Sequence, residues 1–333
     1  MSSPATVVAQ APATVANVAV GFDVLGFAFG SAFDRVAVTR VDPGRAEGPV
    51  TIDMEGSSVG GAVAAGESQV DLPSDPTRNT ASAALLAMAA ELGPEFAFRV
   101  AVHKAIPLSA GMGGSAASAV AAVVAANGLL DSPLPREQLF DYALAGEAAA
   151  SGARHADNVA PCLFGGLCAC LPTGGAIPRV VPIPVPASLH CVVVRPHVEV
   201  STRSARAVLA GEVELEAFTA QSAHLAAFVA ACYEGDLGLM RVAMQDLVIG
   251  PQRESAIPGF EDVHAAALAN GAIGCAIAGS GPSVFAWAAS ADEAATIRDA
   301  MLAALAQHGI GADAFLGPIA TEGAKVVPGA GQV

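Results

Sequence analysis

The segment with the clearest chemical potential is a glycine-rich stretch, PLSAGMGGSAAS, at residues 107–118. A strand is expected before it and a helix after it, so it forms a strand-to-helix turn. Gly111, Gly113 and Gly114 allow the backbone to turn sharply and to approach a ligand closely. The start of the helix adds unpaired N–H groups and the positive end of the helix dipole. Together these features favour an anion site suited to phosphate.

Two other phosphate-binding motifs are absent from this stretch. No lysine follows the glycines, so it is not a G-x-x-x-x-G-K-[ST] loop, and it does not have G-x-G-x-x-G spacing. From its residues alone, an ordinary glycine turn with a serine that caps the helix is an equal alternative.

Ser115 and Glu147 are the candidate metal ligands. A hydroxyl and a carboxylate suit Mg²⁺, which often takes only one or two protein ligands and completes its shell with phosphate oxygens and water. The alternatives are a capping role for Ser115 and a solvated helix position for Glu147, which lies in a helix otherwise rich in Ala and Leu.

The first half of the chain predicts mixed strands and helices. Strands are expected at 5–10, 22–30, 35–41, 96–103 and 163–171, and helices at 79–91, 115–130 and 136–150. Residues 11–21 are expected to form a loop, 55–76 an exposed loop and 151–158 a polar turn.

The proline-rich stretch 172–188 is the best candidate for a domain boundary, which gives predicted domains at 1–175 and 176–333. In the second half, strands are expected at 189–195, 272–278, 283–289 and 313–318. Helices are expected at 202–210, 215–233, 236–247, 259–269 and 292–307. The order lacks strict strand–helix alternation, so it predicts an α+β protein rather than a doubly wound sheet.

Composition excludes several classes of protein. With 16 basic and 31 acidic residues among 333, the chain has a net charge of −15 and no basic run, which argues against nucleic-acid and anionic-membrane binding. Apolar residues make up 53%, enough for a large core. The six cysteines show no C-x-x-C or zinc-ligand spacing, and no segment reads as a signal peptide or a membrane span. We therefore expect a cytoplasmic protein.

Several segments together resemble the homoserine kinases of the GHMP small-molecule kinase superfamily. Residues 12–26 (PATVANVAVGFDVLG) are similar to the N-terminal motif P-A-[ST]-x-A-N-x-G-x-G-F-D-x-[LM]-G, residues 107–118 to the phosphate loop, and residues 278–283 (AGSGPS) to the C-terminal glycine motif. HADNVAP at 155–161 and STRSAR at 201–206 narrow the resemblance to homoserine kinases. Ala19 and Gly114 depart from the pattern, where Gly and Ser are usual.

The resemblance implies an α+β fold of two domains, an N-terminal ribosomal-protein-S5-like domain and a C-terminal ferredoxin-like domain. It implies ATP-dependent phosphorylation of the side-chain hydroxyl of L-homoserine in threonine biosynthesis, with ATP and Mg²⁺. A homodimer is suggested by the family alone.

The resemblance also assigns roles to residues. Asn17 and Asp23 are expected to hold the substrate hydroxyl, and Asp157 the ammonium, with His155 and Asn158 in the same pocket. Arg206 and Arg253 are expected to clamp the carboxylate, which a planar guanidinium binds well. On the nucleotide side, Asn79 is expected to contact adenine, and Ser115 and Glu147 to hold Mg²⁺. Lys104 is a weaker nucleotide candidate. The phosphates are expected on Pro107, Leu108, Ser109, Ala110, Gly111, Met112, Gly113, Gly114, Ser115, Ala116, Ala117 and Ser118.

Related kinases use an Asp as general base at the position of Asn158, which cannot accept a proton as a carboxylate does. Phosphoryl transfer tolerates this difference because positioning and charge neutralisation supply most of the catalysis. Asn17, Asp23 and Asn158 are therefore the expected catalytic residues. The alternatives are a GHMP kinase for another alcohol and a non-catalytic nucleotide-binding protein of the same fold. A dinucleotide-dependent oxidoreductase is disfavoured because G-x-G-x-x-G is absent.

Overall fold

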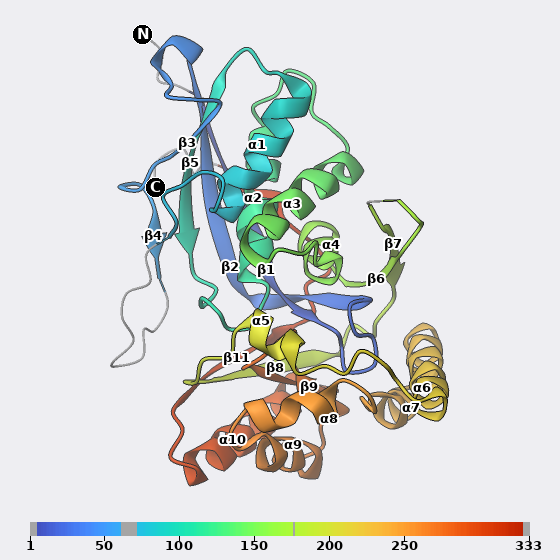
Figure 1. Cartoon of the computed structure of the whole chain (residues 1–333). Helices are drawn as coiled ribbons and strands as arrows, with labels where there is room; N and C mark the ends of the chain where they lie inside the picture. The colour runs from blue at the N-terminus through green and yellow to red at the C-terminus, as the bar shows by residue number, and fades with distance from the viewer. Residues whose placement is uncertain (1–4, 61–71, 176, 329–333) are drawn as a thin grey trace.

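The computed structural model describes residues 5–60, 72–175 and 177–328. Two sheets, one of eight strands and one of four, lie one above the other in Figure 1. Helices cover one side of the upper sheet and the lower side of the small sheet.

The larger sheet is built on two long antiparallel strands, β1 (Thr6–Ala16) and β2 (Leu25–Val41). Its main order is β12-β1-β2-β5-β3, with β5 at Ala97–Lys104 and β3 at Val50–Ile52. The short strand β4 (Ser58–Val59) pairs with β5. At the other end, β6 (Leu167–Leu171) pairs with β2, and β7 (Arg179–Ile183) pairs with β6.

Four helices pack beside this sheet: α1 (Thr80–Leu92), α2 (Gly114–Asn127), α3 (Arg136–Ser151) and α4 (Ala156–Phe164). Helix α2 contacts β1, β2, α1 and α3. This central position explains its composition, because a helix covered on all sides needs small apolar residues rather than one apolar stripe. Every residue from Ala116 to Ala126 is buried.

The smaller sheet is antiparallel and has the order β11-β8-β10-β9. Its strands are β8 (His190–Pro196), β9 (Gly274–Ile277), β10 (Val284–Ala288) and β11 (Ala312–Pro318). Helices α9 (Phe260–Ala269) and α10 (Ala291–Gln307) share a core with it. The sequence of strand and helix elements around this sheet gives the ferredoxin-like arrangement expected.

The other face of the smaller sheet joins the main core. Trp287 of β10 contacts Phe27 of β2, with ring centroids 5.3 Å apart, and Phe228 of α6 (Leu215–Glu234), 5.8 Å away. Phe285 also lies 5.8 Å from Phe27. These aromatic side chains belong to one buried cluster, so the two sheets are held together by a continuous apolar core.

The remaining helices are short and connect β8 to β9. They are α5 (Thr202–Ala207), α7 (Leu237–Ala243) and α8 (Gly250–Arg253), which is followed by a 3₁₀ turn at Glu254–Ala256. Another 3₁₀ turn, Pro43–Arg45, lies between β2 and β3. No helix in residues 5–60, 72–175 or 177–328 is long and apolar enough to cross a membrane.

Several predicted boundaries were wrong. Residues 11–16 continue strand β1, and the strands expected at 22–30 and 35–41 are one strand with a register shift opposite Pro12 and Ala13. Residues 156–158 begin α4 instead of a turn, and that helix runs into the strand expected from 163. Helices expected to end at 210 and 247 end at Ala207 and Ala243. Part of the loop expected at 55–76 lies outside the described residues.

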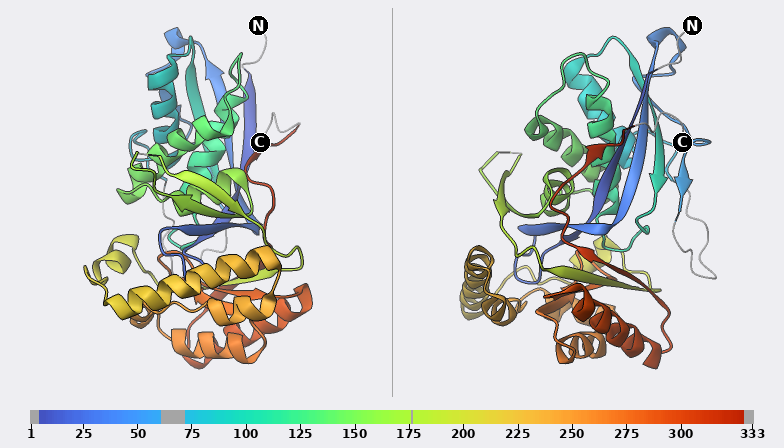
Figure 2. Two further views of the ribbon diagram at one scale, coloured as in Figure 1. Left: turned by 90° about the vertical axis from the view of Figure 1, so that its right-hand side faces the viewer. Right: turned by 180° about the vertical axis from the view of Figure 1, so that it is seen from behind.

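The proline-rich stretch 172–188 contains a strand. Pro182 is tolerated in β7 because this strand pairs on one side only, with β6. Strand β12 (Lys325–Val326) also returns to the larger sheet and pairs with β1, as the red segment beside the blue strands shows in Figure 2. The division at 175/176 stays a prediction, and the larger sheet takes strands from both sides of it.

Candidate active site

A cavity of about 420 Å³ opens where the larger sheet, the glycine loop and the smaller sheet meet. It is lined by all seven residues expected to bind the substrate, by residues 107–115 and by Glu147. These residues come from six separate stretches of the chain. The fold therefore brings together groups that are up to 236 positions apart, from Asn17 to Arg253.

The glycine loop adopts a conformation that suits glycine. Gly111 and Gly113 have φ values of 72° and 65°, in the left-handed region. At Gly111 the loop also lies against the C-terminal glycine motif, since a Cβ there would be 2.5 Å from the carbonyl oxygen of Ala278. Helix α2 begins at Gly114, so its first N–H groups are at the cavity. This is the arrangement of an anion site.

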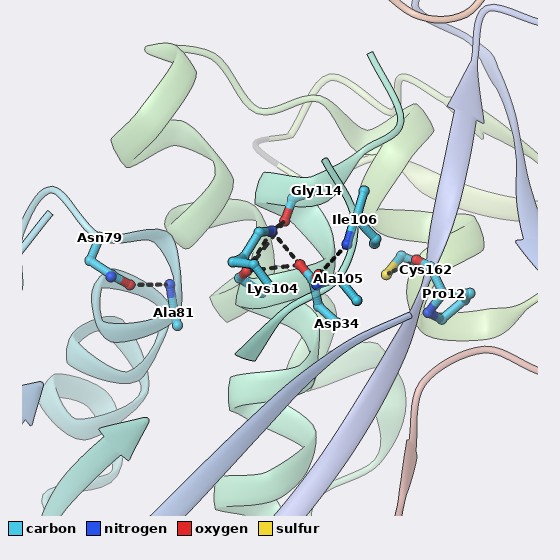
Figure 3. A network of polar contacts seen from close by, with 10 residues as sticks. Pro12, Asp34, Asn79, Ala81, Lys104, Ala105, Ile106, Gly114 and Cys162 are labelled. Carbon is cyan, nitrogen blue, oxygen red and sulfur yellow. Dashed lines mark hydrogen bonds and ion pairs between the residues drawn. The ribbon is translucent and has the colours of Figure 1, made fainter. Parts of the chain in front are cut away.

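A buried ion pair holds the base of the loop (Figure 3). Lys104 pairs with Asp34 of β2 and donates to the carbonyl oxygen of Gly114, 2.6 Å away, and to Ser118 Oγ, 3.1 Å away. The other carboxylate oxygen of Asp34 accepts from the N–H groups of Ala105 and Ile106, at 2.9 and 3.0 Å. The pair therefore fixes both ends of the loop. Because the ammonium makes these three contacts, Lys104 supports the loop rather than reaching a nucleotide.

The first motif has a strained backbone, a feature that clusters at functional sites in proteins. Asn17, Val18 and Ala19 have positive φ values of 72°, 47° and 59°, which side-chain-bearing residues rarely adopt. The amide nitrogen of Asn17 donates to the carbonyl oxygen of Gly279, 2.8 Å away, and its amide oxygen accepts from the N–H of Asp23 at 3.1 Å. Asn17 thus connects its own turn to the C-terminal glycine motif.

Arg206 and Asp23 are paired with each other in the cavity. Arg206 Nη1 donates to Asp23 Oδ2 and Nη2 donates to Asp23 Oδ1, each at 2.9 Å. Both side chains are more than 40% exposed, so the pair stabilises the fold little and is open to exchange with a ligand. The aromatic ring of Phe22 lies between Arg206 and Arg253, 5.4 and 5.1 Å from their guanidinium carbons.

Arg253 is held more firmly. It is buried, and its Nε donates to the carbonyl oxygen of Ala205 at 3.0 Å. Its Nη1 donates to the carbonyl oxygen of Gly279 at 3.1 Å. Burial lowers the pKa of this guanidinium. A fixed, partly desolvated cation of this kind is well suited to bind an anionic group of a ligand.

The opposite wall is acidic. Burial, followed by the charge of Asp23, raises the pKa of the Asp157 carboxyl to about 7. His155 Nδ1 lies 3.1 Å from Glu147 Oε1, and this hydrogen bond raises the pKa of His155. A cation bound beside Asp157 would offset the cost of burying the negative charge of that carboxylate.

Four nucleotide-site candidates have other surroundings. Asn79 is buried at the start of α1, where its amide oxygen accepts from the N–H groups of Ala81 and Ser82. Ala116 and Ala117 are buried within α2, and Ser118 bonds to Asp34 and Lys104. None of the four lines the cavity. Ala116, Ala117 and Ser118 follow the loop directly, and helix geometry turns them into the core. The nucleotide roles that the resemblance implies for these four residues stay predictions.

The structure adds residues that the motifs did not single out. Phe22 and Thr14 lie inside the N-terminal motif, which indicated that they are near the site. Neither was predicted as a site residue, because an aromatic ring and a threonine hydroxyl have no obvious role in binding the substrate. Asp34 had no signal, because it reaches the loop from the middle of a long strand.

Comparison with known families defines the class of protein. The sequence model of the GHMP kinase N-terminal domain matches residues 79–166, and that of the GHMP kinase C-terminal domain matches residues 228–307. The first range holds the glycine loop and the acidic wall, and the second holds Arg253 and the C-terminal glycine motif. The fold is thus that of a GHMP kinase.

Curated relatives resolve the class further. A homoserine kinase from Xanthomonas campestris pv. campestris is 44% identical over 319 residues, covering 96% of this chain and 93% of the relative. One from Chlorobium phaeobacteroides is 41% identical over 330 residues, covering 97% and 99%. The crystal structure of homoserine kinase from Cytophaga hutchinsonii has a TM-score of 0.88 at 39% identity and covers 98% of this chain and 99% of that one. The chain therefore belongs to the homoserine kinases. Leishmania major mevalonate kinase, at 16% identity and a TM-score of 0.66, shares the fold.

Proposed function

We propose that this protein transfers the γ-phosphoryl group of ATP to the side-chain hydroxyl of L-homoserine, forming O-phospho-L-homoserine for threonine biosynthesis. One observation carries the proposal. A single cavity combines an anion-binding loop with a carboxylate wall and two arginines. These are the groups needed to hold ATP beside a zwitterionic amino acid.

The glycine loop is proposed to bind the phosphates. Its N–H groups and the α2 dipole supply positive potential at the cavity. The loop is already fixed by Asp34 and Lys104, so little ordering energy is lost when phosphate binds.

Ser115 and Glu147 are proposed to hold Mg²⁺. Both line the cavity, and a hydroxyl with a carboxylate supplies the hard oxygen ligands that this ion prefers. The described residues contain no cluster of three or more His, Cys, Asp or Glu that could hold a metal, so phosphate and water oxygens would complete the shell. When bound, the ion would neutralise phosphate charge.

Substrate recognition is proposed to use both signs of charge. Asp157, beside His155 and Asn158, would bind the ammonium group, and Arg206 and Arg253 the carboxylate. Arg206 is paired with Asp23. A substrate carboxylate would take the place of Asp23 on Arg206, which frees Asp23 to orient the hydroxyl with Asn17.

This arrangement supports catalysis without a strong general base. Asn17, Asp23 and Asn158 would position the acceptor oxygen in line with the γ-phosphorus, and the loop would stabilise the charge on the transferred group. The proposal also includes a cytoplasmic location, in keeping with six free cysteines that are all buried, and leaves a homodimer as the family's suggestion.

The test is ADP release from MgATP with L-homoserine, D-homoserine, L-threonine, mevalonate and galactose as acceptors. Turnover selective for L-homoserine is expected. Preference for mevalonate or galactose would contradict the zwitterion pocket while leaving a kinase. ATP binding without turnover of any acceptor would favour a non-catalytic protein of this fold.

A further inference from the structure

Thr14 makes a buried contact with the expected catalytic residue Asn158. Thr14 lies near the end of β1 and is fully buried, and its hydroxyl donates to Asn158 Oδ1 at 2.8 Å. Its backbone N–H donates to the carbonyl oxygen of Met112 at 3.1 Å. One residue of the central sheet therefore bonds to the glycine loop through its backbone and to α4 through its side chain.

The glycine loop covers this contact. A Cβ on Gly113 would overlap Thr14 Oγ1 and would come within 2.9 Å of Asn158 Oδ1. Only glycine leaves the hydroxyl and the amide oxygen room to meet. Packed under the loop backbone, the hydrogen bond has a lower local dielectric than one in water, and this strengthens it.

The contact decides which end of the Asn158 amide serves the cavity. A carboxamide has an acceptor oxygen and a donor nitrogen. Thr14 occupies the oxygen, while Asn158 lines the cavity, so the amide nitrogen is the end available to a ligand. An N–H donor can bind a lone pair of the acceptor hydroxyl but cannot take its proton.

We propose that Thr14 is a positioning residue that fixes the Asn158 carboxamide with Nδ2 turned toward the acceptor hydroxyl. This inference rests on the proposed function. In that arrangement, Asn158 donates to the oxygen of the substrate hydroxyl. The proton of that hydroxyl stays free to bond to Asp23, which is proposed to orient it. Thr14 itself touches neither substrate, and it acts on the rate through Asn158.

A double-mutant cycle tests this role. Thr14→Val keeps the shape and removes the hydroxyl, whereas Thr14→Ser keeps the hydroxyl. We expect Thr14→Val to lower kcat for homoserine roughly 3- to 10-fold, the value of one hydrogen bond, and Thr14→Ser to stay within about twofold of the parent. In an Asn158→Ala background, Thr14→Val should change kcat by less than about twofold.

The matched control is Thr6→Val on the same strand. Thr6 Oγ1 bonds only to Thr39 Oγ1 among the described residues, 2.9 Å away and outside the cavity, so its loss should leave kcat unchanged. The proposal would be overturned if Thr14→Val lowered kcat equally in the parent and in the Asn158→Ala background. It would also be overturned if Thr14→Val did not lower kcat in the parent. Absence of homoserine turnover in the parent protein would instead overturn the proposed function.

A second variant tests the orientation without altering Thr14, in case Thr14→Val does not fold. Asn158→Asp keeps an oxygen for Thr14 but presents an acceptor to the cavity in place of the N–H donor. We expect kcat to fall at least about tenfold, because the donor bond to the hydroxyl oxygen is lost and the hydroxyl turns its proton toward the new carboxylate instead. An unchanged or raised kcat would show that an acceptor is preferred there and would overturn the orientation.

Discussion

The two charged walls of the cavity differ in how much freedom their side chains have. Asp157 and Arg253 are buried and fixed, whereas Asp23 and Arg206 are exposed and paired with each other. Fixed charges set specificity because they are already oriented before the ligand arrives. In the exposed pair, Arg206 can exchange Asp23 for the carboxylate of a substrate that enters the cavity.

Activity should fall in acid because Asp157 has to be ionised to attract an ammonium. Burial raises its pKa to about 7, so kcat/KM for homoserine should fall between pH 8 and pH 6. The measurement is a pH–rate profile, and a flat profile over this range would contradict the ammonium role. A raised carboxyl pKa in the folded state makes this group favour folding at lower pH. The melting temperature at pH 6 therefore separates loss of binding from unfolding.

Arg206→Ala should selectively weaken use of homoserine. Loss of a charge-assisted contact costs about 1.5–3 kcal/mol, which corresponds to a fall of roughly 10- to 150-fold in kcat/KM. KM for ATP should barely change, as steady-state kinetics would show. Arg203→Ala, on the same helix and also at the cavity, is the matched control and should have a smaller effect. A selective loss of ATP affinity would remove Arg206 from the carboxylate site.

At the scale of elements, a turn between a strand and a helix becomes a site because its neighbours prevent it from moving. β2 supplies Asp34, β5 supplies Lys104, and β1 supplies Thr14, and all three contact the loop or the start of α2. The strands thus act as a rigid base for an irregular segment.

Lys104→Met tests the buried pair beneath the loop. Removing the lysine leaves Asp34 buried without its counter-charge, so the free energy of unfolding should fall by about 3–5 kcal/mol. Chemical denaturation measures it. The other lysine is the control: Lys325 is exposed and pairs with Glu322, so Lys325→Met should cost less than about 1 kcal/mol. Equal losses for the two variants would contradict this account.

Gly113→Ala should damage the loop more than its backbone conformation alone explains. The new Cβ would overlap Thr14 Oγ1, and the φ of 65° adds about 1–2 kcal/mol of strain. We expect kcat/KM to fall about 100-fold because the loop is displaced. Gly93→Ala is the control, since Gly93 has a φ of 55° but open space around it. If both variants kept full activity in the kinase assay, close packing at Gly113 would not matter.

At the scale of the whole molecule, the site exists because two sheets share one core. Phe27, Trp287 and Phe228 join the sheets, and the cavity is lined by residues from both parts of the chain. The arginines proposed to bind the substrate belong to the segment between β8 and β9, while the loop proposed to bind phosphate belongs to the first sheet's layer. Neither part alone would provide both proposed binding sites.

Nucleotide binding should therefore stabilise the molecule as a unit. MgADP at about 100 times its dissociation constant should add about 2.7 kcal/mol and raise the temperature of a single calorimetric transition. ADP without Mg²⁺ should stabilise less, and Ser115→Ala should reduce the Mg²⁺-dependent part. Two separate transitions, with only one responding to MgADP, would show that the two sheets unfold independently.

The sequence by itself determined the motifs and most of the helices and strands, because turn glycines, the apolar periodicity and residue types act locally. With the family resemblance, it was enough to predict the fold class and most of the residues that line the cavity. It misassigned residues 11–16 and the start of α4, where tertiary pairing overrode local turn signals. The nucleotide roles of Asn79 and Ser118 came from the resemblance and stay predictions; in the structure Asn79 caps a helix and Ser118 lies beneath the loop.

Only the tertiary structure decided how distant groups meet. The contacts of Asp34 with the loop, Thr14 with Asn158 and Arg206 with Asp23 span 71, 144 and 183 positions. No local rule specifies such contacts, because they depend on how strands pair and how helices pack on them. The types of chemistry were therefore readable along the chain, whereas the orientation of each group came from the packing of the two sheets.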